Sequence, residues 1–248
     1  RSRAIERHGT HQTPEADGNI FKMTTDEVNL KRMSTPRPPH GHELLTRRFG
    51  VWQTDSKGRL KLRCIDDFAE SLINDTTLID RAIRMGRVSD LVDVISILES
   101  TSRDLRLLKS DFSAAYRGCP IKTSHLRFAS VLVRDASGNL HQTRLRAMPF
   151  GAVAAVYAWD RLGGAIQAIL QRMFLIPCSR YVDDLFWADF SECSDQGRQT
   201  ALDVVSHLGF TLAVDKTPPA SDCQEVLGIQ IRLQERSGAL SVDVQVEP

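Results

Sequence analysis

The sequence predicts an α+β fold, in which antiparallel strands form a sheet and helices pack behind it. Two segments are typical of β-hairpins, because short apolar runs flank a tight turn in each. Two other segments carry apolar side chains at helical spacing. The chain has 248 residues, 42% of them hydrophobic, and is therefore long enough to bury a sizeable core.

The N-terminal part of the chain has fewer apolar residues than the rest, and they are less regularly spaced. Residues 1–48 are expected to be a linker or a loosely ordered extension, because their apolar side chains are few and follow no steady period. Beyond them, Arg59–Ile65 alternates basic and apolar residues with the period of a strand. Its cations Arg59, Lys61 and Arg63 would share one face, while Leu60, Leu62 and Cys64 would face a core. By itself this face indicates either an ordinary solvated strand or a phosphate contact.

The middle of the chain predicts a helix, a strand and a hairpin. Ser89–Leu98 has the apolar stripe of a surface helix, and Leu105–Phe112 is a strand candidate that places Asp111 near its end. The segments 127–133 and 140–148 flank an Asp-Ala-Ser-Gly turn and predict a hairpin.

A long helix and a second hairpin follow. Val153–Phe174 has helical apolar spacing, although Gly163 and Gly164 should each cost about 1 kcal/mol relative to Ala. The runs 179–182 and 185–188 are separated by Asp183 and Asp184, which is a hairpin signature.

The last predicted elements are one helix and two strands. Ser194 can cap a helix that ends near Leu208, with Gly209 in the stop position. Strands are expected at 210–214 and 226–232.

Charge and cysteine content exclude several classes of protein. The chain has 32 Lys and Arg against 31 Asp and Glu, so attraction to nucleic acid must come from local charge placement. No apolar run approaches the roughly 18 residues of a membrane span, so no membrane partner is expected. Five cysteines without a C-x-x-C pair and the lack of an apolar leader predict a reducing intracellular compartment, cytoplasmic or nuclear. The missing initial Met suggests a piece of a longer product.

Two adjacent acids at a hairpin tip indicate metal chemistry. Asp183 and Asp184 would repel each other unless a cation lay between them, and Asp111 could supply a third carboxylate. Three hard oxygen donors suit Mg²⁺, and a pair of such ions can promote in-line displacement at phosphorus. The alternative is that the two acids are ordinary turn residues.

Three motifs in order decide between these interpretations. DFSAAY at 111–116, MPFG at 148–151 and YVDD at 181–184 resemble the three central palm motifs of reverse transcriptases. The likeness covers about residues 49–232. The MPFG form is most similar to polymerases of long-terminal-repeat retrotransposons, and Tyr-x-Asp-Asp differs from the Gly-Asp-Asp of most RNA-dependent RNA polymerases.

The resemblance implies roles for the residues that match the motifs. It implies that Asp111, Asp183 and Asp184, with the carbonyl of Phe112, bind two Mg²⁺ ions, for which Mn²⁺ is a possible substitute. Tyr116 would be the steric gate that rejects a ribose 2′-hydroxyl.

Other positions would bind the substrates. Residues implied to contact the incoming nucleotide are Lys61, Arg63, Phe112, Tyr116, Phe150 and Gly151. Those implied to support or contact template and primer are Asp67, Asn74, Tyr181, Leu227 and Gly228, the last two at the start of the primer-grip hairpin. Lys216 resembles the lysine that protonates departing pyrophosphate, and an exposed turn lysine is the alternative.

The sequence also departs from the family pattern. Ala69 stands where the family often has Arg, and 152–156 reads AVAAV instead of a proline-containing run. Phe150 replaces the Gln of retroviral enzymes and removes a side-chain hydrogen bond near the nucleotide.

The resemblance therefore predicts a palm, with a ferredoxin-like antiparallel sheet, and fingers over 49–232, with 233–248 as the palm edge or the start of a truncated thumb. The expected activity is RNA-directed DNA synthesis from deoxynucleoside triphosphates on a primed RNA or DNA template. The expected context is a retrotransposon Pol polyprotein with thumb, ribonuclease H and integrase domains. Two alternatives are an RNA-dependent RNA polymerase, against which Tyr116 argues, and an inert nucleic-acid-binding remnant, against which the three intact acids argue.

Overall fold

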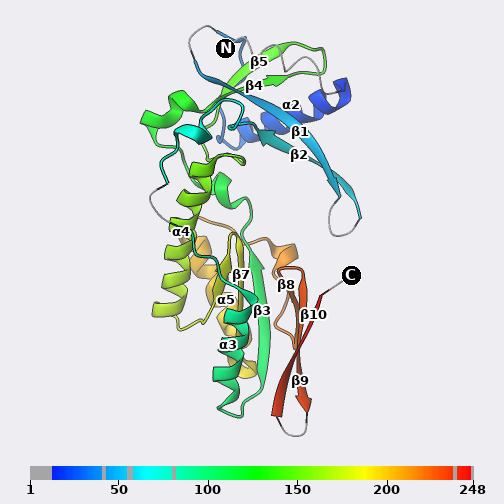
Figure 1. Cartoon of the computed structure of the whole chain (residues 1–248), viewed down its shortest axis with the longest axis vertical. Helices are drawn as coiled ribbons and strands as arrows, with labels where there is room; N and C mark the ends of the chain where they lie inside the picture. The colour runs from blue at the N-terminus through cyan, green and yellow to red at the C-terminus, as the bar shows by residue number, and fades with distance from the viewer. Residues whose placement is uncertain (1–12, 41–42, 55–57, 80–81, 237–238, 247–248) are drawn as a thin grey trace. The chain divides into compact units, whose positions relative to one another are not determined.

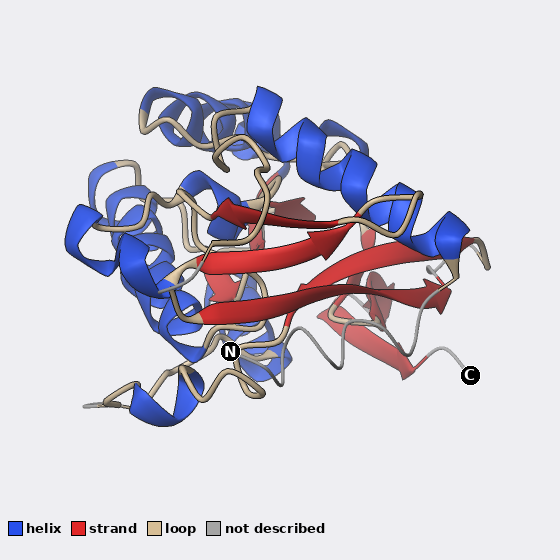
Figure 2. Ribbon diagram, turned by 90° about the horizontal axis from the view of Figure 1, so that it is seen from above, coloured by secondary structure: helices blue, strands red, loops and turns tan. Residues whose placement is uncertain are grey.

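The computed structural model describes residues 13–40, 43–54, 58–79, 82–236 and 239–246, and residues 1–12 of the expected extension lie outside them. Strands gathered into sheets have helices packed against them, which confirms the α+β class (Figure 2). The chain divides into two compact units (Figure 1). Described residues of Arg1–Arg81 and Tyr116–Ala158 form the first unit, and those of Ala82–Ala115 and Trp159–Pro248 form the second.

The first unit is built on a four-stranded sheet in the order β2-β1-β4-β5. Its strands are β1 (Leu45–Thr54), β2 (Leu60–Asp66), β4 (Ser130–Arg134) and β5 (Leu140–Arg144). The pairs β1–β2 and β4–β5 are antiparallel hairpins, and the parallel β1–β4 pair joins them. Apolar side chains of the core lie around Val131 and Leu145, both completely buried.

The first unit also holds helix α2 (Pro14–Asn29), where the sequence predicted a linker or a loosely ordered extension. Thr13 caps its N-terminus and Pro14 occupies the first turn, where its missing N–H is not needed. Ile20 is 1% exposed and lies so close to Gly50 of β1 that a Cβ there would come within 2.9 Å of it. The helix buries few side chains, so its apolar period is weak in the sequence.

The second unit contains two three-stranded antiparallel sheets. The order β3-β7-β6 joins β3 (Leu105–Asp111), β7 (Asp184–Phe190) and β6 (Ser179–Tyr181). The order β10-β9-β8 joins β10 (Ala239–Val246), β9 (Ile229–Arg236) and β8 (Cys223–Val226). The helices are α3 (Val88–Glu99), α5 (Ser191–His207) and the larger part of α4 (Val153–Met173), which begins in the first unit.

Both faces of the β3–β7 pair are covered, which explains why β7 carries the unbroken apolar run Leu185–Ala188. One face carries Leu107 and Phe186, which pack on Leu91 and Ile95 of α3 and on Ile231 of β9. On the opposite face, Asp189 lies against Gly197 of α5, where a Cβ would come within 2.8 Å of its carboxylate. This packing holds the two strands whose ends carry Asp111 and Asp184.

Several predicted elements differ in extent from those observed. The segment 210–214 forms no strand, because Leu212 makes only an isolated bridge to Phe112 and a 3-10 helix follows at Val214–Lys216. Helix α5 begins at Ser191, with Ser194 inside its first turn instead of capping it. Leu60 is 65% exposed and does not face a core.

The expected boundaries at residues 48 and 232 fall inside strands. The first boundary lies within β1. The second lies within β9, whose Ile231 belongs to the core cluster that also contains residues of α3 and β3. No helix in the described ranges has both the length and the apolar content needed to cross a lipid bilayer.

Candidate active site

Three carboxylates lie at one end of the β3–β7–β6 sheet. Asp111 ends β3 and pairs directly with Asp184, the first residue of β7, which in turn pairs with Tyr181 of β6. Directly opposed residues of antiparallel strands have Cβ atoms about 4.5–5.5 Å apart. The sequence placed Asp183 and Asp184 together in the turn, whereas the two turn residues are Val182 and Asp183.

The turn between β6 and β7 has an unusual backbone. Val182 has a φ of 52°, in the left-handed region, where β-branched residues are rarely found and which costs on the order of 1–3 kcal/mol. The carbonyl of Asp183 accepts a hydrogen bond from the Phe112 N–H at 2.9 Å. This bond ties the turn to the residue that follows Asp111.

The acids lie in a half-buried, mutually repelling group. Burial, and then the charges of Asp111 and Asp183, raise the pKa of Asp184 to about 6. Burial and the charge of Asp111 also raise the pKa of Asp183. Because each charge opposes the ionisation of the next, a cation near them would relieve the repulsion.

One cation already lies at the group. The Nζ of Lys216 donates to Asp111 Oδ2 at 2.6 Å, and this hydrogen bond raises the pKa of the lysine. The side chain is 60% exposed and lies in the 3-10 helix Val214–Lys216, at the end of the segment that was expected to be a strand. The structure thus places Lys216 at Asp111, while its role in protonating pyrophosphate stays a prediction.

The carboxylate chemistry suits a hard divalent cation, since such ions prefer oxygen donors. The Asp111 carboxylate, however, accepts the hydrogen bond from Lys216. Across the described ranges, no three His, Cys, Asp or Glu side chains are placed to hold a metal ion. The three carboxylates are therefore the right kind of ligand for Mg²⁺. In this structure, however, Asp111 is paired with the ammonium of Lys216.

Phe112 buries its ring in the core, and its backbone lies next to Asp111 and Asp183. It is 2% exposed, and its ring packs edge-on against Trp159 and Phe210, at centroid distances of 4.9 and 6.3 Å. The expected role of its carbonyl stays a prediction. Tyr181 is 44% exposed and pairs with Asp184, and its contact with template or primer stays a prediction.

The two residues expected at the primer grip form the turn between β8 and β9. Leu227 and Gly228 both have positive φ, of 53° and 75°, which is the backbone of a tight two-residue hairpin. Lys109 Nζ donates to the carbonyl of Glu225 next to this turn at 2.7 Å and so connects it to β3.

The residues expected to bind the nucleotide lie mostly in the first unit. Lys61 and Arg63 are exposed on β2, as the alternation predicted. The rings of Tyr116 and Phe150 meet edge-on at 5.2 Å, and Phe150 is 42% exposed. The expected gate residue therefore has an aromatic partner from the MPFG motif.

Gly151 has a backbone that requires glycine. Its φ is +94°, and a Cβ would lie 2.5 Å from the carbonyl oxygen of Asp66. Asn74 fixes the same segment from the side, because its amide donates to the Gly151 carbonyl and its oxygen accepts from the Val153 N–H, both at 2.9 Å.

Asp67, like Asn74, makes polar contacts with neighbouring parts of the first unit. It accepts from the Glu70 N–H at 2.9 Å and pairs with Arg47 at 3.3 Å. For Asp67 and Asn74, the structure shows local support, one of the two roles that the resemblance implied.

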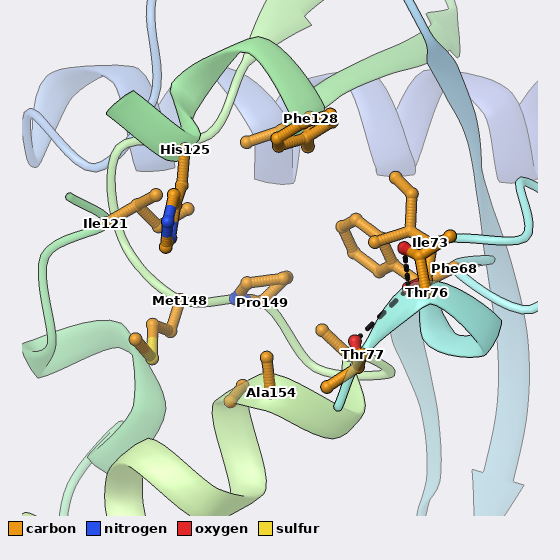
Figure 3. A pocket seen from close by; sticks show the side chains of 13 residues that line it. Phe68, Ile73, Thr76, Thr77, Ile121, His125, Phe128, Met148, Pro149 and Ala154 are labelled. Atoms are coloured by element: carbon orange, nitrogen blue, oxygen red, sulfur yellow. Dashed lines mark hydrogen bonds between the residues drawn. The ribbon is translucent and has the colours of Figure 1, made fainter. Parts of the chain in front are cut away.

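Two features, one in each unit, were not found from the sequence. One is a cavity of about 580 Å³ in the first unit, beside the MPFG segment (Figure 3). Phe68, Ile73, Met148 and Pro149 are among its apolar lining residues, and His125 is on its wall. Such a cavity joins separate stretches of chain and leaves no local sequence signal.

The other feature is Arg180, which is 3% exposed and directly precedes the YVDD motif. Its guanidinium reaches the Val182 carbonyl at 2.6 Å and Asp160 Oδ1 at 2.7 Å. The unusual pair Gly163–Gly164 inside a helix was the available signal, because glycine there marks a close approach.

Comparison with known proteins gives a fold. No protein-family model matches the chain, and no curated protein does. Among solved structures, a foamy viral protease-reverse transcriptase in complex with double-stranded DNA matches 86% of this chain at a TM-score of 0.65 and 14% identity. A mutant of the Prototype Foamy Virus protease-reverse transcriptase matches 93% at 0.67 and 17%.

The chain therefore has a reverse-transcriptase-like fold. It covers 33% and 28% of those two chains, about a third of their length. At 14% and 17% identity, the likeness shows the fold alone.

Proposed function

We propose that this chain is the catalytic core of an RNA-directed DNA polymerase from a retrotransposon-type Pol polyprotein. The observation that carries the proposal is the meeting of Asp111, Asp183 and Asp184 at one sheet end, with Lys216 beside them, in a reverse-transcriptase-like fold. The raised pKa of Asp184 supports it, because perturbed titratable groups concentrate at functional sites.

The three carboxylates would hold two Mg²⁺ ions. When bound, such ions supply Lewis acidity that activates a primer 3′-hydroxyl and stabilises the charge on departing pyrophosphate. Asp111 accepts a hydrogen bond from Lys216 through Oδ2, so this ammonium would compete with a metal ion for that oxygen. Lys216, whose ammonium lies at this carboxylate, would donate a proton to the leaving pyrophosphate.

Substrate choice would come from the first unit. Lys61 and Arg63, exposed on one face of β2, would bind the triphosphate of a deoxynucleotide. The Tyr116 ring, held edge-on by Phe150, would exclude a 2′-hydroxyl. These roles favour DNA synthesis over RNA synthesis on a primed RNA or DNA template.

Primer extension on an RNA template tests this proposal. With Mg²⁺ and deoxynucleotides we expect extension by the chain and none by Asp183→Asn, whereas Asp195→Asn, a substitution on helix α5, should leave extension unchanged. Preference for ribonucleotides would contradict the gate role of Tyr116 and favour an RNA polymerase.

The second candidate function is that of an inert nucleic-acid-binding remnant. It is favoured because Asp111 is paired with Lys216, and because no group of side chains among the described residues is arranged to hold a metal ion. An inert nucleic-acid-binding remnant would bind a primer–template duplex in a salt-dependent way and would not bind Mn²⁺ at the acids. The remnant function is supported by two results together. Primer extension must fail even when a downstream segment is added to the chain, and Asp183→Asn must bind as much Mn²⁺ as the unmodified chain.

A further inference from the structure

The turn that contains Asp183 and precedes Asp184 is held from inside the second unit. The Val182 carbonyl accepts two hydrogen bonds, from the Trp159 indole N–H at 2.7 Å and from the Arg180 guanidinium at 2.6 Å. Both donors are buried, at 1% and 3% exposure. Two buried donors on one carbonyl fix the orientation of the peptide that joins Val182 to Asp183.

Arg180 is in turn held on several sides. Its guanidinium also donates to the Asp160 carboxylate at 2.7 Å, and its carbonyl accepts from the Gly86 N–H at 2.7 Å. A Cβ on Gly86 would lie 2.9 Å from the Arg180 backbone, so only glycine allows this approach.

The glycine pair of α4 explains how a bulky buried arginine fits. A Cβ on Gly163 would lie 3.0 Å from both Cδ and Nε of Arg180, whereas a Cβ on Gly164 would lie 4.0 Å from its terminal nitrogen. Gly163 therefore makes room for the guanidinium, while Gly164 leaves ordinary contact distance. A glycine pair that weakens a helix has a packing reason at only one of its two positions.

The left-handed backbone of Val182 needs such support. A residue with a branched Cβ does not adopt a φ of 52° on its own, and a surrounding structure must impose it. Without the two donors, the Val182–Asp183 peptide could rotate toward a relaxed turn, and the Asp183 carboxylate would move with it.

We propose that Arg180, together with Trp159, is a positioning residue that holds the Val182–Asp183 peptide and so fixes the acids for catalysis. This inference rests on the proposed function for its catalytic consequence. Its structural part, the fixing of the turn, can be measured without any activity.

The matched pair Gly163→Ala and Gly164→Ala gives the test. Both replacements improve helix propensity equally, but only the first places a methyl group against Arg180. We expect Gly163→Ala to lower kcat for primer extension by about 10- to 100-fold with little change in KM for the deoxynucleotide, as loss of a supporting contact does. Gly164→Ala should match the unmodified chain.

Trp159→Phe and Arg180→Met give the same test from the donor side, with Arg172→Met on the exposed end of α4 as control. Trp159→Phe keeps an aromatic ring against Phe112 but removes part of the indole together with its N–H donor, whereas Arg180→Met leaves the ring of Trp159 in place and so separates loss of a donor from loss of this packing. Each of the two donor variants should lower kcat, whereas Arg172→Met should not.

Hydrogen exchange supplies the readout that does not depend on activity. The Phe112 N–H donates to the Asp183 carbonyl, so release of the turn should speed its exchange by about tenfold or more. The Leu107 N–H, which donates to Ser221 elsewhere on β3, should be unaffected.

The two readouts separate the possible failures. If the chain shows no extension but Phe112 exchange rises in Gly163→Ala, Trp159→Phe and Arg180→Met, the turn is held as inferred and the proposed function is at fault. If extension occurs, but these three variants match their controls in both kcat and Phe112 exchange, the positioning role is overturned. Equal losses in Gly163→Ala and Gly164→Ala would also overturn it.

Discussion

Gly151, the last residue of the MPFG motif, occupies a position that only glycine fits without strain. Any side chain there meets both a positive φ and the Asp66 carbonyl at 2.5 Å. Gly138 has a similar φ of +86° but no neighbour of its Cβ closer than 3.9 Å, so it isolates the backbone effect.

We expect Gly138→Ala to lower the free energy of unfolding by about 1–2 kcal/mol, the cost of left-handed backbone for a residue with a Cβ. Gly151→Ala should cost about 1–3 kcal/mol more, because a neighbouring strand must also move. Urea unfolding of the two variants measures the difference. Equal losses would show that the contact with Asp66 relaxes freely.

Asp135 provides a pH-dependent contribution at the β4–β5 turn. The hydrogen bond from His141, and then those from Asn139 and Ser137, lower the pKa of Asp135 from 3.8 to about 2. A carboxyl with a lowered pKa stabilises the fold above its unfolded pKa, and the contribution disappears as the pH falls through the folded value.

Asp135→Asn should therefore lower the melting temperature at pH 7, and the gap to the unmodified chain should shrink as the pH falls from about 5 to about 2. Thermal unfolding across this range measures it. A gap that stays constant with pH would mean that the charge of Asp135 has no part in stability. The exposed Asp195→Asn serves as the control and should show no gap.

At the scale of elements, helix α2 is part of the first unit's packing. Ile20 is 1% exposed and contacts the β1–β2 hairpin near Gly50 and Leu62. The same region contains the buried pair of Arg48 and Asp66, whose side chains meet at 2.7 Å. A helix that was expected to be a loose extension therefore helps to cover the hairpin that carries Lys61 and Arg63.

Ile20→Ala should cost about 2–5 kcal/mol in the free energy of unfolding, the range for an emptied buried aliphatic site. Lys22→Ala, two residues away on the exposed side of the helix, should change it by less than about 0.5 kcal/mol. Chemical denaturation of both variants measures the effect. Similar small values for the two would show that α2 contributes little to the stability of the unit.

At the scale of the whole molecule, charge is nearly balanced, at 32 basic against 31 acidic side chains. Binding of a polyanion must therefore depend on local groups such as Lys61 and Arg63, and not on a general field. Arg63 is exposed on β2, and Arg172 is exposed on α4 in the other unit.

We expect Arg63→Ala to raise KM for the deoxynucleotide and to weaken its dependence on salt, because one cation–phosphate contact is lost. Arg172→Ala should leave both unchanged. Steady-state extension at several salt concentrations measures the slopes. If the two variants behave alike, the cations of β2 have no special role in binding the substrate.

The sequence by itself determined the elements whose signals are local. The alternation of Arg59 to Ile65, the helical spacing of Val153 to Phe174 and the paired runs around Asp183 depend only on each segment's own period, and all three elements are present. The order of the three motifs likewise indicated the fold that the structural comparison shows.

Only the tertiary structure decided what depends on distant partners. Helix α2 was missed because its few buried side chains need the β1–β2 hairpin, although Thr13 and Pro14 are local start signals. The segment 210–214 was expected as a strand and has no ladder partner beyond one bridge. The contact of Lys216 with Asp111 spans 105 residues, and the donors that hold Val182 come from two different elements. A one-dimensional pattern records which side chains are present, but contacts between remote segments are set by packing, which no single segment encodes.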